Sequence, residues 1–437
     1  MGPAGSKSVL SIGGVGAPEL AERYGTPLYV YDVALVEELA RGFLEAFAAE
    51  GTLLAYSVKA NGNLTILHRL AALGCGADVT SAGELHRALK AGVEPSRIVF
   101  AGVGKSEAEI RAGLATGICA FNVESASELR RIERVARTEG VRARVGVRVN
   151  PDVDAATPHE FTRTGRAADK FGVPWREVVG LFEWAAERDA LAPRGLAMHI
   201  GSQIVETAPY AEALERVAGL AEQLMAAGFP LEYLDIGGGF GIGYDGGERL
   251  DFRALAEEVV PRVVGLGLRL ILEPGRAIVG EAGVLLTRVE YVKRTAGKTF
   301  VIVDGGMSEL LRPSHYGGFH AIEIAGDAEA VNGVGTGGKA RNESAPDPGG
   351  RSREAVDVVG PVCESGDFLA RDRRLPRLPA EGELLAVRTA GAYGFTMASN
   401  YNGRPRPAEV MVERGAARIV RRRETLDDLI RGEELPT

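Results

Sequence analysis

The first three-fifths of the chain alternates short apolar runs with stretches of helical periodicity. Eight apolar runs predict β-strands: Leu53–Val58, Ala77–Thr80, Ile98–Ala101, Cys119–Val123, Val145–Val149, Gly195–Ile200, Tyr233–Ile236 and Leu268–Leu272. Amphipathic stretches between them predict helices: Leu64–Leu73, Glu84–Ala91, Glu107–Ala115, Ser125–Arg137 and Ala211–Ala227. Ser106 is placed to cap one helix, and five glycines lie where helices should end: Gly74, Gly92, Gly117, Gly140 and Gly228.

About eight β–α alternations in roughly 240 residues are typical of a (β/α)8 barrel. A doubly wound parallel sheet has the same local alternation, so periodicity alone does not separate the two folds. The number of units and their even spacing favour the barrel. In both folds, reactive side chains should gather just beyond the carboxyl ends of the strands.

From about residue 280 the pattern becomes β-rich, which predicts a second, all-β domain. The predicted strands are Val284–Val292, Thr299–Val303, Val356–Val359, Leu384–Thr389, Glu409–Glu413 and Ala417–Val420. Only Thr425–Gly432 resembles a short helix, and residues 325–355 have the Gly, Asn, Asp and Pro content of an exposed loop. We therefore expect a barrel domain at 35–281 and a β-sandwich or β-barrel domain at 282–437 that includes residues 1–34.

Composition narrows the classes of function. The 437 residues carry 51 Lys and Arg against 59 Asp and Glu, a net charge of −8, and the only basic run is Arg421–Arg423. A nucleic-acid or membrane partner is therefore disfavoured, because both need a positive field. Three cysteines, no CxxC pair and no apolar leader predict a cytoplasmic protein without disulfides, and we assign no metal site.

The ends of the first and sixth predicted strands carry an amine and an imidazole. Lys59 follows the first strand, where desolvation can free its amine to form a Schiff base. His199 ends the sixth strand. Each residue alone is more often structural: a rim lysine reaches solvent, and a single histidine satisfies hydrogen bonds.

The seventh and eighth strands lead into two further signals. Consecutive glycines at Gly237–Gly239 let several backbone N–H groups approach one anion. Glu273-Pro274-Gly275-Arg276 supplies a carboxylate and a guanidinium, although Pro-Gly alone indicates only a turn. Amine, imidazole, phosphate cradle and carboxylate together are the groups that pyridoxal 5′-phosphate needs.

Two motifs resemble nucleotide-binding sequences but lack the features that such sites need. Gly241–Gly246 fits GxGxxG, but no helix begins directly after it, so a dinucleotide site is not expected. Gly104-Lys105-Ser106 matches the end of a phosphate-binding loop, yet Val99 stands where its first glycine would be. We interpret that segment as a strand-to-helix turn.

The motifs of the second half are more selective: Asp304-Gly305-Gly306-Met307, Leu311-Arg312-Pro313-Ser314-His315-Tyr316-Gly317, Gly360-Pro361-Val362-Cys363-Glu364-Ser365-Gly366-Asp367, Ala392-Tyr393-Gly394 and Ser399-Asn400-Tyr401-Asn402-Gly403-Arg404-Pro405-Arg406-Pro407. With the barrel motifs they make the chain resemble the diaminopimelate decarboxylases. These are fold-type III pyridoxal-phosphate enzymes related to ornithine decarboxylase and alanine racemase. The resemblance runs from Tyr29-Val30-Tyr31-Asp32 to Arg421–Leu426.

The resemblance implies a role for each matching position. Those expected to bind the cofactor are Lys59 by a covalent bond, His199 on the ring, Ser202 and Gly237, Gly238 and Gly239 at the phosphate, Glu273 at the pyridine nitrogen, and Pro274, Gly275, Arg276 and Tyr393 around it. Those expected to bind the substrate are Arg276, Arg312 and Tyr316 at the distal carboxylate, Glu364 at the distal ammonium, and Tyr393. Cys363 is the expected proton donor, and with Glu364 it should enter the site of a second subunit, which implies a homodimer.

The activity implied is decarboxylation of meso-2,6-diaminopimelate to L-lysine and CO2. One alternative is a related decarboxylase for another carboxylated basic amino acid, and a second is a racemase, which the Cys-Glu-Ser motif disfavours. A third is a non-catalytic binding protein of the same fold, which retention of Lys59 and Cys363 makes less favourable. The chain departs from the family in the long 325–355 segment and in the loose match of Pro158–Gly165.

Overall fold

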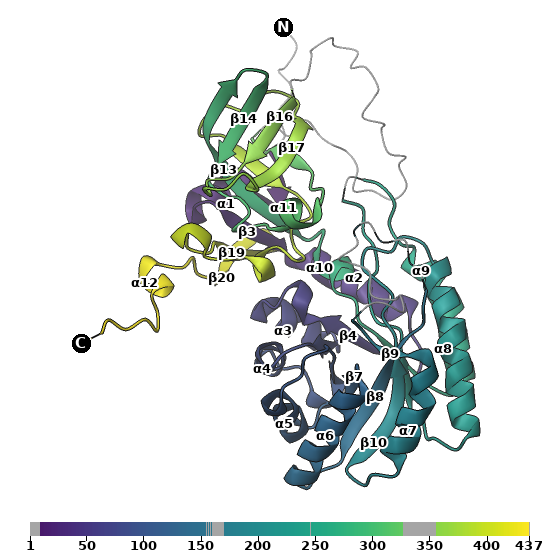
Figure 1. The fold of residues 1–437 in the computed structure, drawn as a ribbon. Helices are drawn as coiled ribbons and strands as arrows, with labels where there is room; N and C mark the ends of the chain where they lie inside the picture. The colour runs from purple at the N-terminus through teal and green to yellow at the C-terminus, as the bar shows by residue number, and fades with distance from the viewer. Residues whose placement is uncertain are drawn as a thin grey trace. The chain divides into compact units, whose positions relative to one another are not determined.

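The structure is a computed structural model, and it describes residues 9–153, 155, 157, 159, 170–244, 246–326 and 355–436. Two compact units make up the chain (Figure 1): Met1–Val36 with Gly243–Glu248 and Val279–Thr437, and Glu37–Ile242 with Arg249–Ile278. Most of the predicted loop at 325–355 and of segment 158–165 lies outside the described residues.

Eight parallel strands form a closed barrel in the second unit. They are β4 (Leu53–Ser57), β5 (Gly76–Val79), β6 (Ile98–Phe100), β7 (Ala120–Val123), β8 (Ala143–Asn150), β10 (Leu191–Ala197), β11 (Tyr233–Asp235) and β12 (Arg269–Leu272). Each pairs in parallel with the next, and pairing of β12 with β4 closes the ring. A short strand, β9 (Val173–Pro174), pairs in parallel with the end of β8. The predicted barrel is confirmed, because a doubly wound sheet would leave two open edges.

One helix precedes the first strand, one lies between each strand and the next around the outside of the barrel, and a single helical turn follows the last strand (Figure 1). They are α2 (Val33–Ala46), α3 (Leu64–Ala72), α4 (Ala82–Lys90), α5 (Glu107–Thr116), α6 (Ala126–Glu139), α7 (Val178–Ala186), α8 (Ala208–Ala226), α9 (Phe252–Gly265) and α10 (Arg276–Val279). Single 3-10 turns lie at η1 (Val58–Ala60), η2 (Pro95–Arg97) and η4 (Trp175–Glu177). The predicted cap is confirmed: the side chains of Ser106 and Glu109 form a reciprocal capping box on α5. All five predicted helix-ending glycines have positive φ.

Tyr233 fills part of the barrel interior, and two glycines on neighbouring strands make room for it. A Cβ at Gly195 would lie 2.3 Å from its ring, and one at Gly146 would lie 2.2 Å from its hydroxyl oxygen. Leu53, Val99 and Ile271 are buried in the same cluster. The barrel is therefore a packed core, and ligands have to bind at its rim.

The first unit is built on a twisted sheet. It contains β1 (Ser11–Ile12), β2 (Val15–Gly16), β3 (Leu28–Asp32), β13 (Gly283–Thr295), β14 (Lys298–Val303), β15 (Ile322–Ile324), β16 (Ala355–Val359), β17 (Phe368–Arg374), β18 (Leu384–Val387), β19 (Ala408–Glu413) and β20 (Ala416–Arg421). Its helices are α1 (Ala17–Tyr24), α11 (Arg312–Tyr316), α12 (Leu426–Leu429), and the 3-10 turns η5 (Phe395–Met397) and η6 (Tyr401–Gly403). The sheet order is β17-β16-β14-β13-β3-β19-β20, and β18 joins β13 to β15.

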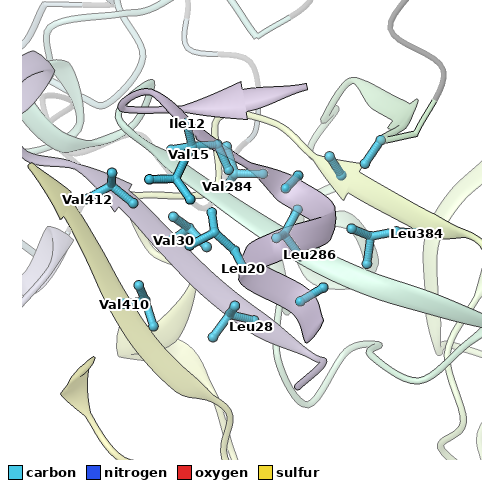
Figure 2. Packing of buried hydrophobic residues seen from close by; sticks show 14 of the residues in the cluster. Ile12, Val15, Leu20, Leu28, Val30, Val284, Leu286, Leu384, Val410 and Val412 are labelled. Atoms are coloured by element: carbon cyan, nitrogen blue, oxygen red, sulfur yellow. The ribbon is translucent and has the colours of Figure 1, made fainter. Parts of the chain in front are cut away.

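The long strand β13 organises this unit. Its first half pairs with β3 and β18 on its two sides, and its second half pairs with β14. Figure 2 shows Leu20 of α1 packed with Val30, Leu286 and Val410 in the core. All six predicted strands are present, whereas β1, β2, β3, β15 and β17 were not predicted from the pattern. The predicted all-β character holds, apart from these short helices.

Candidate active site

Lys59 lies at the carboxyl rim of the barrel, beside a buried acid. β4 ends at Ser57, one residue before the predicted end, and Lys59 sits in the 3-10 turn η1 that follows. Its Nζ lies 3.0 Å from Oδ2 of Asp78, a buried residue of β5. Ser57 Oγ lies 2.9 Å from the same oxygen and 3.0 Å from the Glu273 carbonyl oxygen. The amine is therefore held in a fixed place next to the barrel interior.

His199 faces the glycine loop. β10 ends at Ala197, so His199 lies just beyond the strand rather than in it, which corrects the predicted strand end. The backbone N–H of Gly238 donates to His199 Nδ1 over 3.1 Å. Desolvation, with the positive charges of Arg148 and Lys59, holds the pKa of the imidazole well below its ordinary value. The ring is accordingly neutral, with Nδ1 as acceptor.

The three consecutive glycines after β11 form a loop that admits no side chain. Gly237 and Gly239 have φ of +71° and +97°. A Cβ at Gly238 would lie 2.0 Å from the Glu273 carbonyl oxygen, and one at Gly239 would lie 2.1 Å from the Gly201 carbonyl oxygen. Such a glycine loop at a barrel rim can bring backbone N–H groups to a phosphate.

Glu273 and Asp235 form a buried pair of carboxyl groups. Asp235 ends β11, Glu273 follows β12, and their side chains are hydrogen-bonded to each other. Burial raises the pKa of both groups, and for Glu273 the charges of Asp235 and Asp78 add to the effect. Asn122 Nδ2 and the Gly237 N–H each donate to Asp235 over 2.9 Å. Because two adjacent carboxylates repel, each group binds a proton more readily than an isolated carboxyl group does.

The segment after Glu273 closes onto the end of β4. A Cβ at Gly275 would lie 3.0 Å from the Ser57 Cβ, and the Ser57 N–H donates to the Pro274 carbonyl oxygen over 3.0 Å. Arg276 begins α10 and its Nη2 donates to Ser202 Oγ over 3.0 Å. The predicted phosphate-side and cofactor-side residues therefore share one rim.

The remaining predicted residues belong to the first unit, where they form two groups. Arg312 is buried in α11, and its Nη1 lies 2.6 Å from His320 Nε2. Its guanidinium also lies over the Tyr244 ring, 4.4 Å from the centroid. Tyr316 ends the same helix and packs its ring against His315.

The second group is an exposed loop that carries Cys363 and Glu364. The Cys363 N–H donates to Asn402 Oδ1 over 2.8 Å, and the Tyr401 hydroxyl donates to the Glu364 carboxylate. Tyr393 lies half-buried with a left-handed φ of 56°. Cys363 is the exposed cysteine of the three, so its thiol can be reached from outside this unit.

The residues of the barrel rim fit pyridoxal 5′-phosphate. They combine a lysine amine, a side-chain-free loop with φ values that favour glycine, and a buried acid whose pKa is raised. Asp78, Asn122 and the role of Asp235 were not predicted from the sequence. Asp78 lies inside the run Gly76-Ala77-Asp78-Val79, where an acid in an apolar strand was an available signal.

Comparisons with known proteins agree with this site. Residues 33–280 match the family described as "Pyridoxal-dependent decarboxylase, pyridoxal binding domain". The chain thus belongs to the pyridoxal-phosphate-dependent decarboxylases, and pyridoxal 5′-phosphate is its cofactor. It is 46% identical to the diaminopimelate decarboxylase of Pseudomonas aeruginosa over 97% of this chain and 96% of that protein. Within the class, the chain belongs to the diaminopimelate decarboxylase family.

Solved structures support the same family and the same fold. The diaminopimelate decarboxylase of Helicobacter pylori, complexed with L-lysine, is 42% identical, with a TM-score of 0.86 over 95% of this chain and 98% of that one. The enzyme of M. jannaschii, also with L-lysine, is 35% identical, with a TM-score of 0.87 over 99% and 97%. The predicted fold class, a barrel with a C-terminal β domain, is confirmed.

The described part of the chain contains neither a cluster of metal ligands nor a membrane-spanning helix. No group of three or more His, Cys, Asp or Glu side chains there could hold a metal ion. Among the helices of the same residues, none is long and apolar enough to cross a membrane.

Proposed function

We propose that the protein decarboxylates meso-2,6-diaminopimelate to L-lysine and CO2. The observation that carries the proposal is the barrel rim itself, where Lys59, the Gly237–Gly239 loop and the Glu273–Asp235 pair lie together. Relatives named diaminopimelate decarboxylase, which match nearly the whole chain, supply the substrate. The L-lysine complexes of two of them fit the product.

We propose that residues 35–281 bind the cofactor. Lys59 would hold it covalently, His199 would cover the ring, and Ser202 with the Gly237–Gly239 loop would hold the phosphate. When bound, pyridoxal phosphate provides an electron sink for the electron pair left when a carboxylate departs as CO2.

The buried acids would set the charge around that group. Glu273 would pair with the pyridine nitrogen, and Asp235 would hold Glu273 in place. Asp78 would position the Lys59 amine through its contact of 3.0 Å. A neutral His199 adds no positive charge beside the ring, so the protonation of the pyridine nitrogen would depend on the buried acids.

Residues 282–437, with 1–34, would supply further groups to the site, of which Cys363 and Glu364 would come from a second copy of the chain. Arg276, Arg312 and Tyr316 would bind the distal carboxylate, since guanidinium groups bind carboxylates in a bidentate manner. Glu364 would bind the distal ammonium, and Tyr393 would contact cofactor and substrate. The Cys363 thiol would donate a proton to the carbon that has lost CO2, and it would regain one from water. This arrangement makes the working unit a homodimer, and we propose that it operates in the cytoplasm.

The assay compares release of CO2 from the meso, L,L and D,D isomers of diaminopimelate with release from ornithine, arginine and lysine. We expect the meso isomer to be turned over, with L-lysine as product. Turnover of ornithine or arginine in its place would overturn the substrate assignment.

The shared site has its own test, in which inactive Lys59→Ala and Cys363→Ala proteins are mixed. Mixed dimers should recover one working site in two, and no recovery would contradict the sharing.

A further inference from the structure

The loop that carries Cys363 and Glu364 is held on one flank by a buried acid. Asp367 accepts hydrogen bonds from the N–H groups of Val362 and Met307, each over 2.6 Å. These bonds hold the start of the loop against the turn at 304–307. The backbone N–H of the next residue, Cys363, is bonded by a different segment.

That segment is the 3-10 turn η6. Asn402 Oδ1 accepts from the Cys363 N–H over 2.8 Å. Asn402 itself has φ 55° and ψ 24°, a left-handed conformation that asparagine tolerates better than most residues. The backbone of η6 thus aims the amide side chain at the peptide of Cys363.

The neighbouring residue of the same turn contacts the neighbouring residue of the loop. The Tyr401 hydroxyl donates to Glu364, and the negative charge of that carboxylate raises the pKa of Tyr401 above its ordinary value. Tyr401 remains 47% exposed, so the contact is not explained by burial of its ring. Two adjacent residues of η6 therefore hold two adjacent residues of the loop.

The turn is braced on its far side, which makes it a firm support. Asn400 Nδ2 donates to Glu424 Oε2 over 2.6 Å, and Arg406 Nε donates to Glu424 Oε1 over 2.8 Å. Partial burial raises the pKa of Glu424, but hydrogen bonds from Arg406 and Asn400 outweigh it and lower the value to about 2. Arg404 Nη2 also donates to the Asp304 carbonyl oxygen over 3.1 Å.

We propose that Tyr401 and Asn402 are positioning residues for the reaction: Asn402 fixes the backbone of Cys363, and Tyr401 orients the carboxylate of Glu364. The inference rests on the proposed function, which makes Cys363 the proton donor and Glu364 the partner of the distal ammonium. The two residues then have separable effects. Asn402 acts on protonation and so on kcat, whereas Tyr401 acts on substrate binding and so on KM.

Asn402→Gly tests the first half, because glycine keeps the left-handed backbone and removes only the acceptor. We expect kcat to fall by about five- to tenfold with KM little changed, as one lost hydrogen bond corresponds to roughly that factor. Asn402→Asp keeps an acceptor and should restore most of the rate. Arg414→Gly is the matched control, since Arg414 is an exposed residue with φ 50° in another turn of the same unit.

Tyr401→Phe tests the second half. It should raise KM for meso-diaminopimelate by about fivefold or more and leave kcat nearly unchanged, since one hydrogen bond to a charged group is lost. Tyr291→Phe, at a tyrosine that is 62% exposed on β13, is the control for loss of a phenol hydroxyl. Wild-type kinetics in both Asn402→Gly and Tyr401→Phe would overturn the proposal.

Mixing experiments show whether η6 acts with Cys363 or only stabilises the subunit. Asn402→Gly mixed with Lys59→Ala should regain a site with full rate, because the intact loop and the intact lysine come from different subunits. Asn402→Gly mixed with Cys363→Ala should give no site with the full rate, because both substitutions affect the same loop. The reverse pattern, or equal recovery in both mixtures, would overturn the assignment of Asn402.

Alkylation separates failure of this inference from failure of the proposed function. Iodoacetamide should modify Cys363 faster in Asn402→Gly than in wild type and Arg414→Gly, because the loop loses its support, and this needs no turnover. If the wild-type protein is inactive but Asn402→Gly is still alkylated faster, the proposed decarboxylation is refuted and the support of the Cys363 loop by Asn402 is retained. An active wild type whose alkylation and kinetics are unchanged by Asn402→Gly would refute the support and retain the function.

Discussion

Glu309 is a buried carboxyl group whose replacement should change how stability depends on pH. It is only 2% exposed, and its Oε2 accepts the Gly306 N–H over 2.6 Å. Burial raises the pKa of Glu309 from 4.5 to about 7, against the opposing effects of the Gly306 N–H and the Arg404 charge. The folded protein therefore keeps a proton on Glu309 at pH values where the unfolded chain has lost it.

The sign and size of the effect follow from linkage. The contribution of Glu309 to the unfolding free energy is fully present below about pH 4.5 and is lost as the pH rises through 7. Each pH unit between the two pKa values corresponds to about 1.4 kcal/mol, so the loss between pH 5 and pH 8 amounts to about 2 to 3 kcal/mol. Glu309→Gln keeps the oxygen acceptor and does not titrate, so the variant should lack this loss.

The assay is urea unfolding of both proteins, with cofactor, at pH 5, 6, 7 and 8. The unfolding free energy of Glu309→Gln minus that of wild type should increase by about 2 to 3 kcal/mol across this range. Glu381→Gln, at an exposed glutamate before β18, gives the baseline for removal of one carboxylate. A difference between Glu309→Gln and wild type that stays constant with pH would show that Glu309 does not have a raised pKa in the folded protein.

Three further predictions concern the site and the barrel. Gly239→Ala should abolish binding of pyridoxal phosphate, because its Cβ would lie 2.1 Å from the Gly201 carbonyl oxygen. Binding is measured by the absorbance of the dialysed protein, and normal binding would contradict a role of the Gly237–Gly239 loop at the phosphate. Arg312→Lys should raise KM for meso-diaminopimelate about tenfold or more, because lysine cannot form the bidentate contact; an unchanged KM would remove Arg312 from the substrate site. Ser106→Ala should lower the unfolding free energy by about 1 kcal/mol in urea titrations, because the capping box with Glu109 is lost; equal stability would show that the box is not needed.

The barrel could be predicted from sequence because its strands are buried on both faces and end at glycines and polar rim residues. Helices α7 and α9 could not be recognised in the same way. α7 begins with Val178 and Val179 and has Glu183 as its single charged residue, so it shows little amphipathic periodicity. α9 contains Pro261, a residue that ordinarily ends a helix. Both form because packing on the barrel outweighs local preference.

In the β unit, two of the missed strands depend on pairing with other strands. β17 has the sequence Phe-Leu-Ala-Arg-Asp-Arg-Arg, which shows no alternation, and it exists through antiparallel pairing with β16. β3 pairs with β13 and β19, which lie more than two hundred residues away in the chain. Such pairing is not visible in a local pattern.

The candidate site was predictable only as far as strand ends could be located. Lys59, His199 and Glu273 were found because each follows an apolar run. Asp78 and Asp235 lie within strands, and their effect on the lysine and on Glu273 requires barrel closure, which brings β4, β5, β11 and β12 together. Sequence motifs predicted which chemical groups the site contains, whereas the Glu273–Asp235 pair forms only when the barrel closes.

Covalent attachment of the cofactor to Lys59 is the claim that the rest of the account depends on most. The direct measurement is borohydride reduction of the protein with pyridoxal phosphate, followed by proteolysis and mass spectrometry of the labelled peptide. We expect one reduced adduct per chain, on Lys59, and none in Lys59→Ala. A label on another lysine in the native protein, or a protein that takes up no pyridoxal phosphate, would contradict it.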